Sequence, residues 1–453
     1  MLIRRTVSTA TKASRQIPYP SLRDLVKKRP PHLRLRCSKE AYGDIYKFKI
    51  PMGPEAVMLF DPNDAEIVYR SAGKWPNRPG FLALEEFRSS NPLYTNAAGL
   101  LSSQGEPWHD FRAKVQTALL RPQNIRAYHD RVDAVAKDFI EDVFIKTLGE
   151  DGRATPDLIQ HLYQWGLEST GVLAFDRRLG VLSTELQIID LVQKIFSLSQ
   201  SLERNLIWKY IGSLLPNYRK MVQCFEQNGV PCKEIERNTL DAGSSVIGNL
   251  YKAGCDSNVL CVLALDMLMA GVDTAANQIA FAFYFIAQNP RVQEKLASYL
   301  MATLREVLRV RPTAYVNTRI CDMPVQLKDF TIEEGNMVLF CHIVMCHDPR
   351  FVNEPEEFRP ERYIKSSPLY ERLQPFTSLP FGHGPRVCVG RRFANLEMCL
   401  LLARVLSKYR LELTPEPLKI TVPLLMKPEE SEEWRTRLAM DNNNCGIQSF
   451  FII

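Results

Sequence analysis

The chain has 453 residues, of which 45% are hydrophobic, and this length and composition allow a large buried core. The formal net charge is only +6, which excludes the strongly basic composition typical of proteins that bind nucleic acids. The 11 cysteines form no Cys-x-x-Cys pair and follow no apolar secretory segment, so we expect reduced thiols and not a disulfide framework.

The first 23 residues are basic and rich in serine and threonine, and no acidic residue precedes Asp24. This composition is typical of a mitochondrial transit peptide, although an ordinary basic terminus would share it. No stretch of the chain approaches the roughly 18 apolar residues that a membrane-spanning helix needs. Together these features favour the mitochondrial matrix.

The order of periodic segments predicts the fold class. Helical periodicity dominates from about residue 64 to residue 312. Strand-like runs bounded by proline or glycine occur on both sides of it, at residues 44–50, 56–60, 323–340 and 409–426. With no repeat or linker, the sequence predicts a mainly α protein with a small β region (α+β). We expect a transit-like segment at 1–23, one catalytic domain at 24–426 and a divergent tail at 427–453.

A glycine-rich stretch near the C-terminal end, Phe381 to Arg392, brackets Cys388 with three glycines and a proline. Glycines let the backbone approach a flat object closely and leave backbone N–H groups free to point at the sulfur. A helical pattern follows, so we expect a thiol with a lowered pKa that is suited to ligate a metal. One thiolate cannot build a zinc site, but it can be the only protein ligand to a haem iron. The alternative is a structural cysteine at a turn.

The same stretch resembles the haem-binding signature of the cytochrome P-450 family, Phe-x-x-Gly-x-Arg-x-Cys-x-Gly. All five defined positions match: Phe381, Gly384, Arg386, Cys388 and Gly390. The resemblance implies the cytochrome P-450 fold, with a long central helix over haem b (iron protoporphyrin IX) and the cysteine loop beneath it. It also implies a monooxygenase in which Cys388 ligates the iron.

An apolar helical pattern from Leu265 to Ala287 is interrupted by Asp273 and Thr274. Buried acids and hydroxyls need partners, and a threonine can bond back to a carbonyl and loosen a helical turn. The segment resembles the oxygen-activation motif of the family. That resemblance implies that Thr274 hydrogen-bonds dioxygen and that Asp273 relays protons. A kinked helix with a satisfied polar pair is the alternative.

Trp108 and Arg112 are four residues apart, directly after Pro107, so both side chains lie on one face of a predicted helix. An indole N–H and a guanidinium group can donate to the same carboxylate. The family uses such a pair to hold a haem propionate, and the resemblance extends this role to Arg319 and Arg386. A surface arginine beside a core tryptophan is the alternative.

Glu306 and Arg309 are three residues apart on a predicted helix and can form an ion pair. They match the Glu-x-x-Arg motif of the family, which couples to a further arginine, here Arg362. The resemblance implies a structural brace for the cysteine loop and no catalytic role.

The chain has no Gly-x-Gly-x-x-Gly fingerprint for a flavin or dinucleotide, so its electrons must come from another protein. By resemblance to mitochondrial members, this partner is an adrenodoxin-type ferredoxin with its NADPH reductase. A basic docking face would include Arg305, Arg311, Arg391 and Arg392, although Met301 occupies a position that is basic in the family pattern. A solvated basic surface is the alternative.

The segments that would line the pocket by resemblance are apolar or small, which suits a sterol-sized or xenobiotic lipophilic substrate. They are the loop from Pro92 to Leu100, the helix around Ala270, and residues 313–317 and 421–424. Residues 182–251 would form a lid and a surface peripheral to the inner membrane.

Two regions depart from the family pattern. The chain is shorter between Thr274 and Glu306, near residues 296–299, and the tail after Pro428 lacks the expected closing strands. A haem-binding pseudoenzyme without turnover therefore remains an alternative. A haem-thiolate isomerase or dehydratase is a third possibility, against which the retained Asp273 and Thr274 argue.

Overall fold

The structure is a computed structural model that describes the greater part of the chain. The described residues are 17–18, 31–50, 53–91, 94, 99–147, 158–182, 191, 194–195, 197–199, 201–202, 212–227, 245–413, 420–421, 426–428 and 436–440. The predicted transit-like segment lies outside them except for Ile17 and Pro18.

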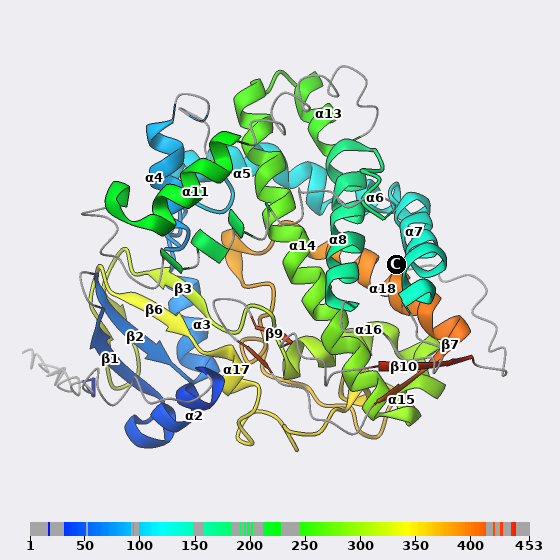
Figure 1. Cartoon of the computed structure of the whole chain (residues 1–453). Coiled ribbons are helices and arrows are strands. Elements are labelled where there is room, and N and C mark those ends of the chain that lie inside the picture. The colour runs from blue at the N-terminus through cyan, green and yellow to red at the C-terminus, as the bar shows by residue number, and fades with distance from the viewer. Residues whose placement is uncertain are drawn as a thin grey trace, which may run out of the picture.

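A four-stranded sheet occupies one side of the molecule (Figure 1). Its strand order is β1-β2-β6-β3, with β1 (Ile45–Lys49), β2 (Glu55–Leu59), β6 (Met337–Phe340) and β3 (Asn317–Ile320). β2 pairs antiparallel with β1 and parallel with β6, and β3 pairs antiparallel with β6. The prediction of a small sheet built from distant parts of the chain is confirmed.

Helices make up most of the rest of the described chain, so the predicted mainly α class is also confirmed. Their bounds are α2 (Pro31–Tyr42), α3 (Pro62–Ser71), α4 (Leu82–Ser90), α5 (Gly105–Leu120), α6 (Pro122–Arg126), α7 (His129–Asp138), α8 (Leu158–Phe175), α11 (Pro216–Gln227), α13 (Val246–Lys252), α14 (Ser257–Gln288), α15 (Pro290–Glu294), α16 (Leu296–Val310), α17 (His342–Met345) and α18 (Arg391–Lys408). The short strands are β4 (Val325–Gln326), β5 (Thr331–Ile332), β7 (Tyr409–Leu413), β8 (Ile420–Thr421), β9 (Lys427–Pro428) and β10 (Thr436–Met440).

Helix α14 runs through the middle of the helical part (Figure 1). At 32 residues it is about 48 Å long, and most of its side chains are buried. It packs closely along α8: a Cβ atom added to Gly271 would lie 2.7 Å from Thr170 Oγ1, and one added to Gly166 would lie 3.2 Å from the Val272 carbonyl oxygen. These glycines therefore set the close approach of the two helices.

The expectation that no segment reaches the length and hydropathy of a membrane span is wrong for α14. An 18-residue window of this helix has a mean hydropathy of 1.8 and passes that test. The window is 72% buried inside the protein, because a central helix surrounded by other helices is apolar on all sides. The position of α14 in the buried core therefore explains its apolar composition.

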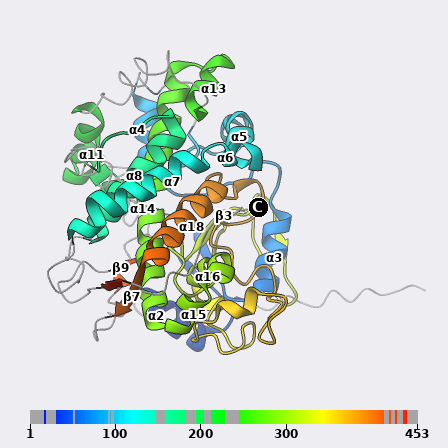
Figure 2. The ribbon, with the colours of Figure 1, turned by 90° about the vertical axis from the view of Figure 1, so that its right-hand side faces the viewer.

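Helix α18, which follows the cysteine loop, contacts α7, α14 and α16 and lies between α7 and α16 in the turned view (Figure 2). It therefore connects the cysteine loop to the helical core.

The chain after Pro428 contributes a strand, β10, to the described structure. β10 pairs antiparallel with β7, with Thr436 opposite Leu413 and Met440 opposite Tyr409. Strand pairing depends on backbone geometry, so a divergent sequence can keep it. Thr436–Met440 of the predicted tail thus pair with a strand of the domain, and residues 429–435 and 441–453 lie outside the described chain.

Candidate functional site

The cysteine loop is a tight turn that closes on itself before α18. Gly382 and Gly384 have φ angles of 72° and 74°, a left-handed conformation that glycine adopts without strain. The Cys388 backbone N–H donates to the Phe381 carbonyl oxygen at 2.8 Å. The loop therefore holds its cysteine at a fixed position ahead of the helix.

Cys388 is exposed, whereas the other free cysteines in the described chain are buried or half-buried. The backbone N–H groups of Gly390 and Arg391 donate to its sulfur, as the glycine pattern predicts. The protein packed around the loop nevertheless desolvates the sulfur and raises the pKa of the Cys388 thiol, although the residue keeps solvent-accessible surface. This effect exceeds the lowering by these donors and by Arg112. The expected lowering of the thiol pKa is therefore wrong for the protein alone, because burial outweighs the local donors.

Four guanidinium groups gather around this loop: those of Arg78, Arg112, Arg319 and Arg386. Burial lowers the pKa of all four guanidinium groups. Repulsion by Arg78 lowers the pKa of the other three further. The pKa falls to about 8 for Arg386 and to about 10 for Arg112 and Arg319. The cluster is therefore an unbalanced positive site inside the protein.

Sequence reasoning found three of these arginines and missed Arg78. Arg78 lies between Pro76 and Pro79, and its backbone N–H donates to Gln104 Oε1 at 2.9 Å. The only local signal was a single arginine held between two prolines, which does not by itself indicate a ligand.

The cluster is held by backbone carbonyls and an aromatic ring. The Arg386 guanidinium lies 3.6 Å from the centre of the Trp108 ring and donates from Nε to the Pro76 carbonyl oxygen at 2.9 Å. Arg112 Nη2 donates to the Val387 carbonyl oxygen at 2.8 Å, and Arg319 Nη2 donates to that of His383 at 3.1 Å. Two of the predicted cations thus bond directly to the cysteine loop.

No carboxylate of the described residues forms a salt bridge with any of these four arginines. Two of their nitrogen atoms, Arg112 Nε and Arg386 Nη1, are buried without a hydrogen-bond partner in the described chain. Buried charges need a counter-charge and buried donors need acceptors. The residues present therefore fit a ligand that carries more than one negative charge and lies beside an accessible cysteine.

Asp273 and Thr274 lie near the middle of α14. Thr274 Oγ1 donates to the Ala270 carbonyl oxygen at 2.7 Å, the back-bond that the sequence suggested. Asp273 Oδ1 is buried and has no hydrogen-bond partner among the described residues. Burial raises the pKa of Asp273 to about 6, so this carboxyl group can gain or lose a proton near neutral pH.

Glu306, Arg309 and Arg362 lie together and are fully buried. Glu306 Oε1 accepts from Arg309 Nη2 at 2.7 Å and from Arg362 Nε at 3.0 Å. Arg309 also donates at 2.8 Å to the carbonyl oxygens of Cys346 and Pro355. One carboxylate therefore joins α16 to the segment that leads toward the cysteine loop.

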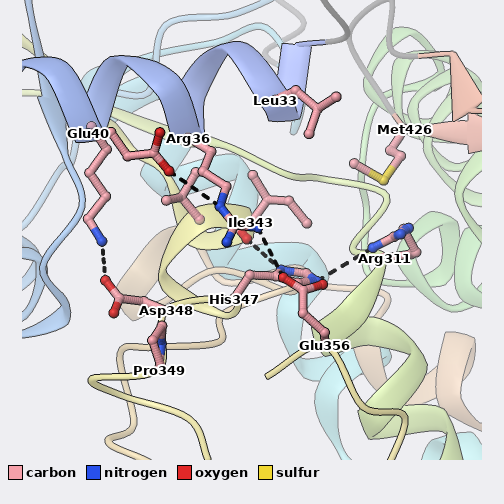
Figure 3. Close-up of a pocket in the computed structure, with 12 residues that line it drawn as sticks. Leu33, Arg36, Glu40, Arg311, Ile343, His347, Asp348, Pro349, Glu356 and Met426 are labelled. Carbon is pink, nitrogen blue, oxygen red and sulfur yellow. Dashed lines mark hydrogen bonds and ion pairs between the residues drawn. The ribbon is translucent and has the colours of Figure 1, made fainter. Parts of the chain in front are cut away.

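The arginines predicted to form a docking face differ in their exposure to solvent. Arg305, Arg391 and Arg392 are exposed, and the Arg305 guanidinium lies 4.9 Å from the centre of the Tyr363 ring. Arg311 instead is half-buried and lines a pocket of about 290 Å³ between α2 and α17 (Figure 3). Its Nη1 atom lies 3.5 Å from His347 Nε2, so this guanidinium points into the pocket.

The chain matches the sequence model of the family described as Cytochrome P450 over residues 19–298 and 297–434. The two matched stretches meet at residues 297–298, within the region near 296–299 where we expect the chain to be shorter than the family pattern. This match extends through most of the chain and includes every predicted site residue.

Curated relatives are similar along most of their own length. The chain is 30% identical over 408 residues to cytochrome P450 302a1, mitochondrial, of Drosophila melanogaster, which covers 82% of this chain and 81% of that protein. It is 29% identical over 442 residues to probable cytochrome P450 12b2, mitochondrial, of the same fly, covering 87% and 82%. It is also 29% identical over 429 residues to cytochrome P450 CYP12A2 of Musca domestica, covering 82% and 79%.

The buried carboxylate of Glu306 gives a stability prediction. Replacing Glu306 by Gln leaves two buried guanidinium groups without their shared counter-charge, so the free energy of unfolding should fall by about 3–5 kcal/mol. Urea titration measures this loss. The matched control is Glu357→Gln, because that carboxylate is 60% exposed in its pair with Arg359 and should change stability by less than about 1 kcal/mol. Equal losses of stability in the two variants would contradict the structural role of Glu306.

The raised pKa of Asp273 gives a pH-dependent prediction. The folded protein holds this proton up to about pH 6, whereas the unfolded chain releases it near pH 4, so ionisation above pH 6 costs folding stability. Asp273→Asn should therefore be more stable than the parent by about 1–3 kcal/mol near pH 8 and should show no advantage below about pH 4. Urea titration at both pH values checks this, with the exposed Asp130→Asn as control. A gain that did not depend on pH would count against it.

Proposed function

The chain belongs to the cytochrome P450 family, in its mitochondrial class, and we propose that this monooxygenase inserts one oxygen atom into a lipophilic substrate with electrons from a ferredoxin. The observation that carries the proposal is that an accessible cysteine lies beside a group of arginines whose positive charge is not neutralised by a carboxylate of the described residues. We assign residues 24–426, together with β10, to one catalytic domain.

The proposed cofactor is haem b, with Cys388 as its ligand and its propionates on the arginine cluster. The Gly390 N–H donates to the sulfur, and Phe381 fixes the loop through its carbonyl oxygen. Arg112, Arg319 and Arg386, with Trp108 packed beneath Arg386, supply the positive charge that two propionates require. When bound, a thiolate-ligated haem supplies dioxygen activation and C–H oxygenation.

The proposed proton route uses two residues of α14. Thr274 Oγ1 donates its one proton to the Ala270 carbonyl oxygen, so its hydroxyl can accept from a neighbouring donor, or can donate to a new acceptor by exchanging this bond. Asp273 has a pKa near 6 and an unpartnered oxygen, so it can take a proton from water and pass it on. We assign Asp273 to relay and Thr274 to delivery.

Glu306, Arg309 and Arg362 are assigned a structural role. Their hydrogen bonds are made to one another, to Glu371 and to backbone groups, and all three side chains are buried. They hold the chain that precedes the cysteine loop, and they contact no proposed reactant.

The substrate we propose is apolar and sterol-sized or a comparable xenobiotic. Among the residues expected to line the pocket, Leu100, Ala314 and Val316 are half-buried, so each retains accessible apolar surface. Leu93, Ala97, Val422 and Leu424 lie outside the described residues. The support for this substrate class is the apolar character of these positions.

The partner we propose is an adrenodoxin-type ferredoxin, reduced by its NADPH reductase. Arg391 and Arg392 are exposed at the start of α18, three residues after Cys388, so a protein docked there approaches the cysteine from the loop side. Arg305 extends this positive surface from α16. An acidic ferredoxin is the complementary partner.

The location we propose is the matrix side of the inner mitochondrial membrane, with peripheral contact. Leu214 and Tyr251 are exposed by 67% and 42%, and both lie in the region expected to touch the membrane. Leu206, Ile207 and Trp208, an apolar run within the same region, lie outside the described residues.

Replacing Cys388 tests the proposed cofactor ligand. The reduced parent protein with carbon monoxide should show the Soret band of thiolate-ligated haem, and Cys388→Ser should lose it because a serine hydroxyl is not a thiolate. The control is Cys321→Ala, which removes a buried thiol elsewhere. An unchanged spectrum in Cys388→Ser would overturn the proposal. A normal spectrum without ferredoxin-dependent product would instead identify a pseudoenzyme.

Reversing charge on the docking face tests the proposed partner. The double variant Arg391→Glu and Arg392→Glu should raise the KM for ferredoxin by about fivefold or more and weaken its dependence on salt, because complementary charge is lost. The measurement is the rate at which the haem iron of this protein is reduced at increasing ferredoxin concentration. Lys328→Glu is the control, because Lys328 is exposed between β4 and β5. Equal effects in both variants would exclude a specific docking face.

A further inference from the structure

A buried ion pair outside the proposed haem and proton residues joins α14 to α4. Asp266 Oδ1 on α14 accepts from Arg88 Nη2 at 2.8 Å. The exposed fractions of the two side chains are 1% and 4%. A pair so deeply buried is costly to desolvate and is a poor source of stability compared with apolar packing. The contacts of this ion pair point to a role other than stability.

The other oxygen of Asp266 holds a loop. Oδ2 accepts from the backbone N–H of Leu100 at 2.6 Å and from that of Leu101 at 3.3 Å. Both leucine side chains are half-buried, so each residue has a tethered backbone and a side chain with accessible apolar surface. One carboxylate therefore fixes an arginine and two consecutive backbone amides.

Gly99 shows how closely this loop approaches the ion pair. A Cβ atom added at Gly99 would lie 2.4 Å from Arg88 Nη1 and 2.9 Å from Asp266 Oδ2. Neither distance is possible for real atoms, so the approach depends on the missing side chain.

The far side of the loop bonds to the arginine cluster. The Leu101 carbonyl oxygen accepts from Arg78 Nη2 at 3.4 Å. Further along, Gln104 Oε1 accepts from the Arg78 backbone N–H and from Arg386 Nη2, both at 2.9 Å. The loop is thus held between α14 and the proposed propionate site. Asp266 precedes Asp273 by seven residues, which is two turns along the same helix face.

We propose that Asp266, with Arg88, is a positioning residue that fixes residues 99–101 at the edge of the substrate space and so determines whether a bulky ligand fits. The inference rests on the proposed function, because it takes this space to lie above a haem. Asp266 acts through the Leu100 and Leu101 backbone and touches no reactant.

The test compares Asp266→Asn with a matched control. In Asp266→Asn one acceptor oxygen becomes an NH₂ donor that faces either Arg88 or a backbone N–H, so the loop loses part of its tether. Glu168 offers the same arrangement on α8, where it accepts from Arg178 and from the backbone N–H groups of Gly180 and Val181. Glu168→Gln therefore removes an equivalent tether that lies on another loop.

Three readouts on the haem-loaded protein decide the outcome. In Asp266→Asn the dissociation constant of the bulky azole econazole should rise about tenfold, while that of imidazole changes by less than about twofold. Hydrogen exchange at the Leu100 and Leu101 amides should become faster. Glu168→Gln should change neither azole and should speed exchange only near Val181. Unchanged econazole binding in Asp266→Asn, or equal weakening of both azoles, would overturn the inference.

A second variant covers the case in which Asp266→Asn does not fold. Gly99→Ala keeps both charges but pushes the loop off the ion pair, so the same selective loss of econazole binding is expected. Equal or absent effects there would overturn the inference. If neither azole shifts the spectrum of the parent protein, the proposed function itself fails, which is a distinct result.

Discussion

Repulsion among four arginines around one cysteine is the constraint on which the site depends. Two like charges roughly 7 Å apart repel by about 2 kcal/mol at an effective dielectric constant of 20. The carbonyl oxygens that accept from these guanidinium groups spread the charge without cancelling it. An anionic ligand relieves the repulsion, so its binding free energy adds to the stability of the fold.

Glu306 shows the contrasting case of a balanced cation pair. It lies between two buried guanidinium groups and satisfies both through one carboxylate, with Glu371 as a second partner of Arg362. These two guanidinium groups need no additional anion, so the arrangement is consistent with a structural role alone. The difference between the two arginine groups is the presence of a carboxylate. This difference separates a brace from a ligand site more clearly than the number of arginines does.

Local patterns predicted the elements well because helix spacing and glycine turns act over a few residues. The sheet, the central helix and the back-bond of Thr274 follow from such patterns. Arg78 could not be found in this way, since its partners are distant in sequence and meet only in the fold. The shift in the thiol pKa of Cys388 was predicted in the wrong direction for the same reason. The N–H donors that lower this pKa are local in sequence, whereas the burial that raises it depends on the whole molecule.

The stretch between α14 and α16, which we expect to be shorter than the family pattern, packs against a strand. The short helix α15 follows α14 directly, and Val292 is fully buried. Gln293 then makes two hydrogen bonds with Leu411 of β7, donating to its carbonyl oxygen at 2.8 Å and accepting from its N–H at 2.9 Å. An amide side chain thus pairs with the strand as a backbone would. Because β7 also pairs with β10, this one strand contacts both the short helix α15 and the strand formed after Pro428.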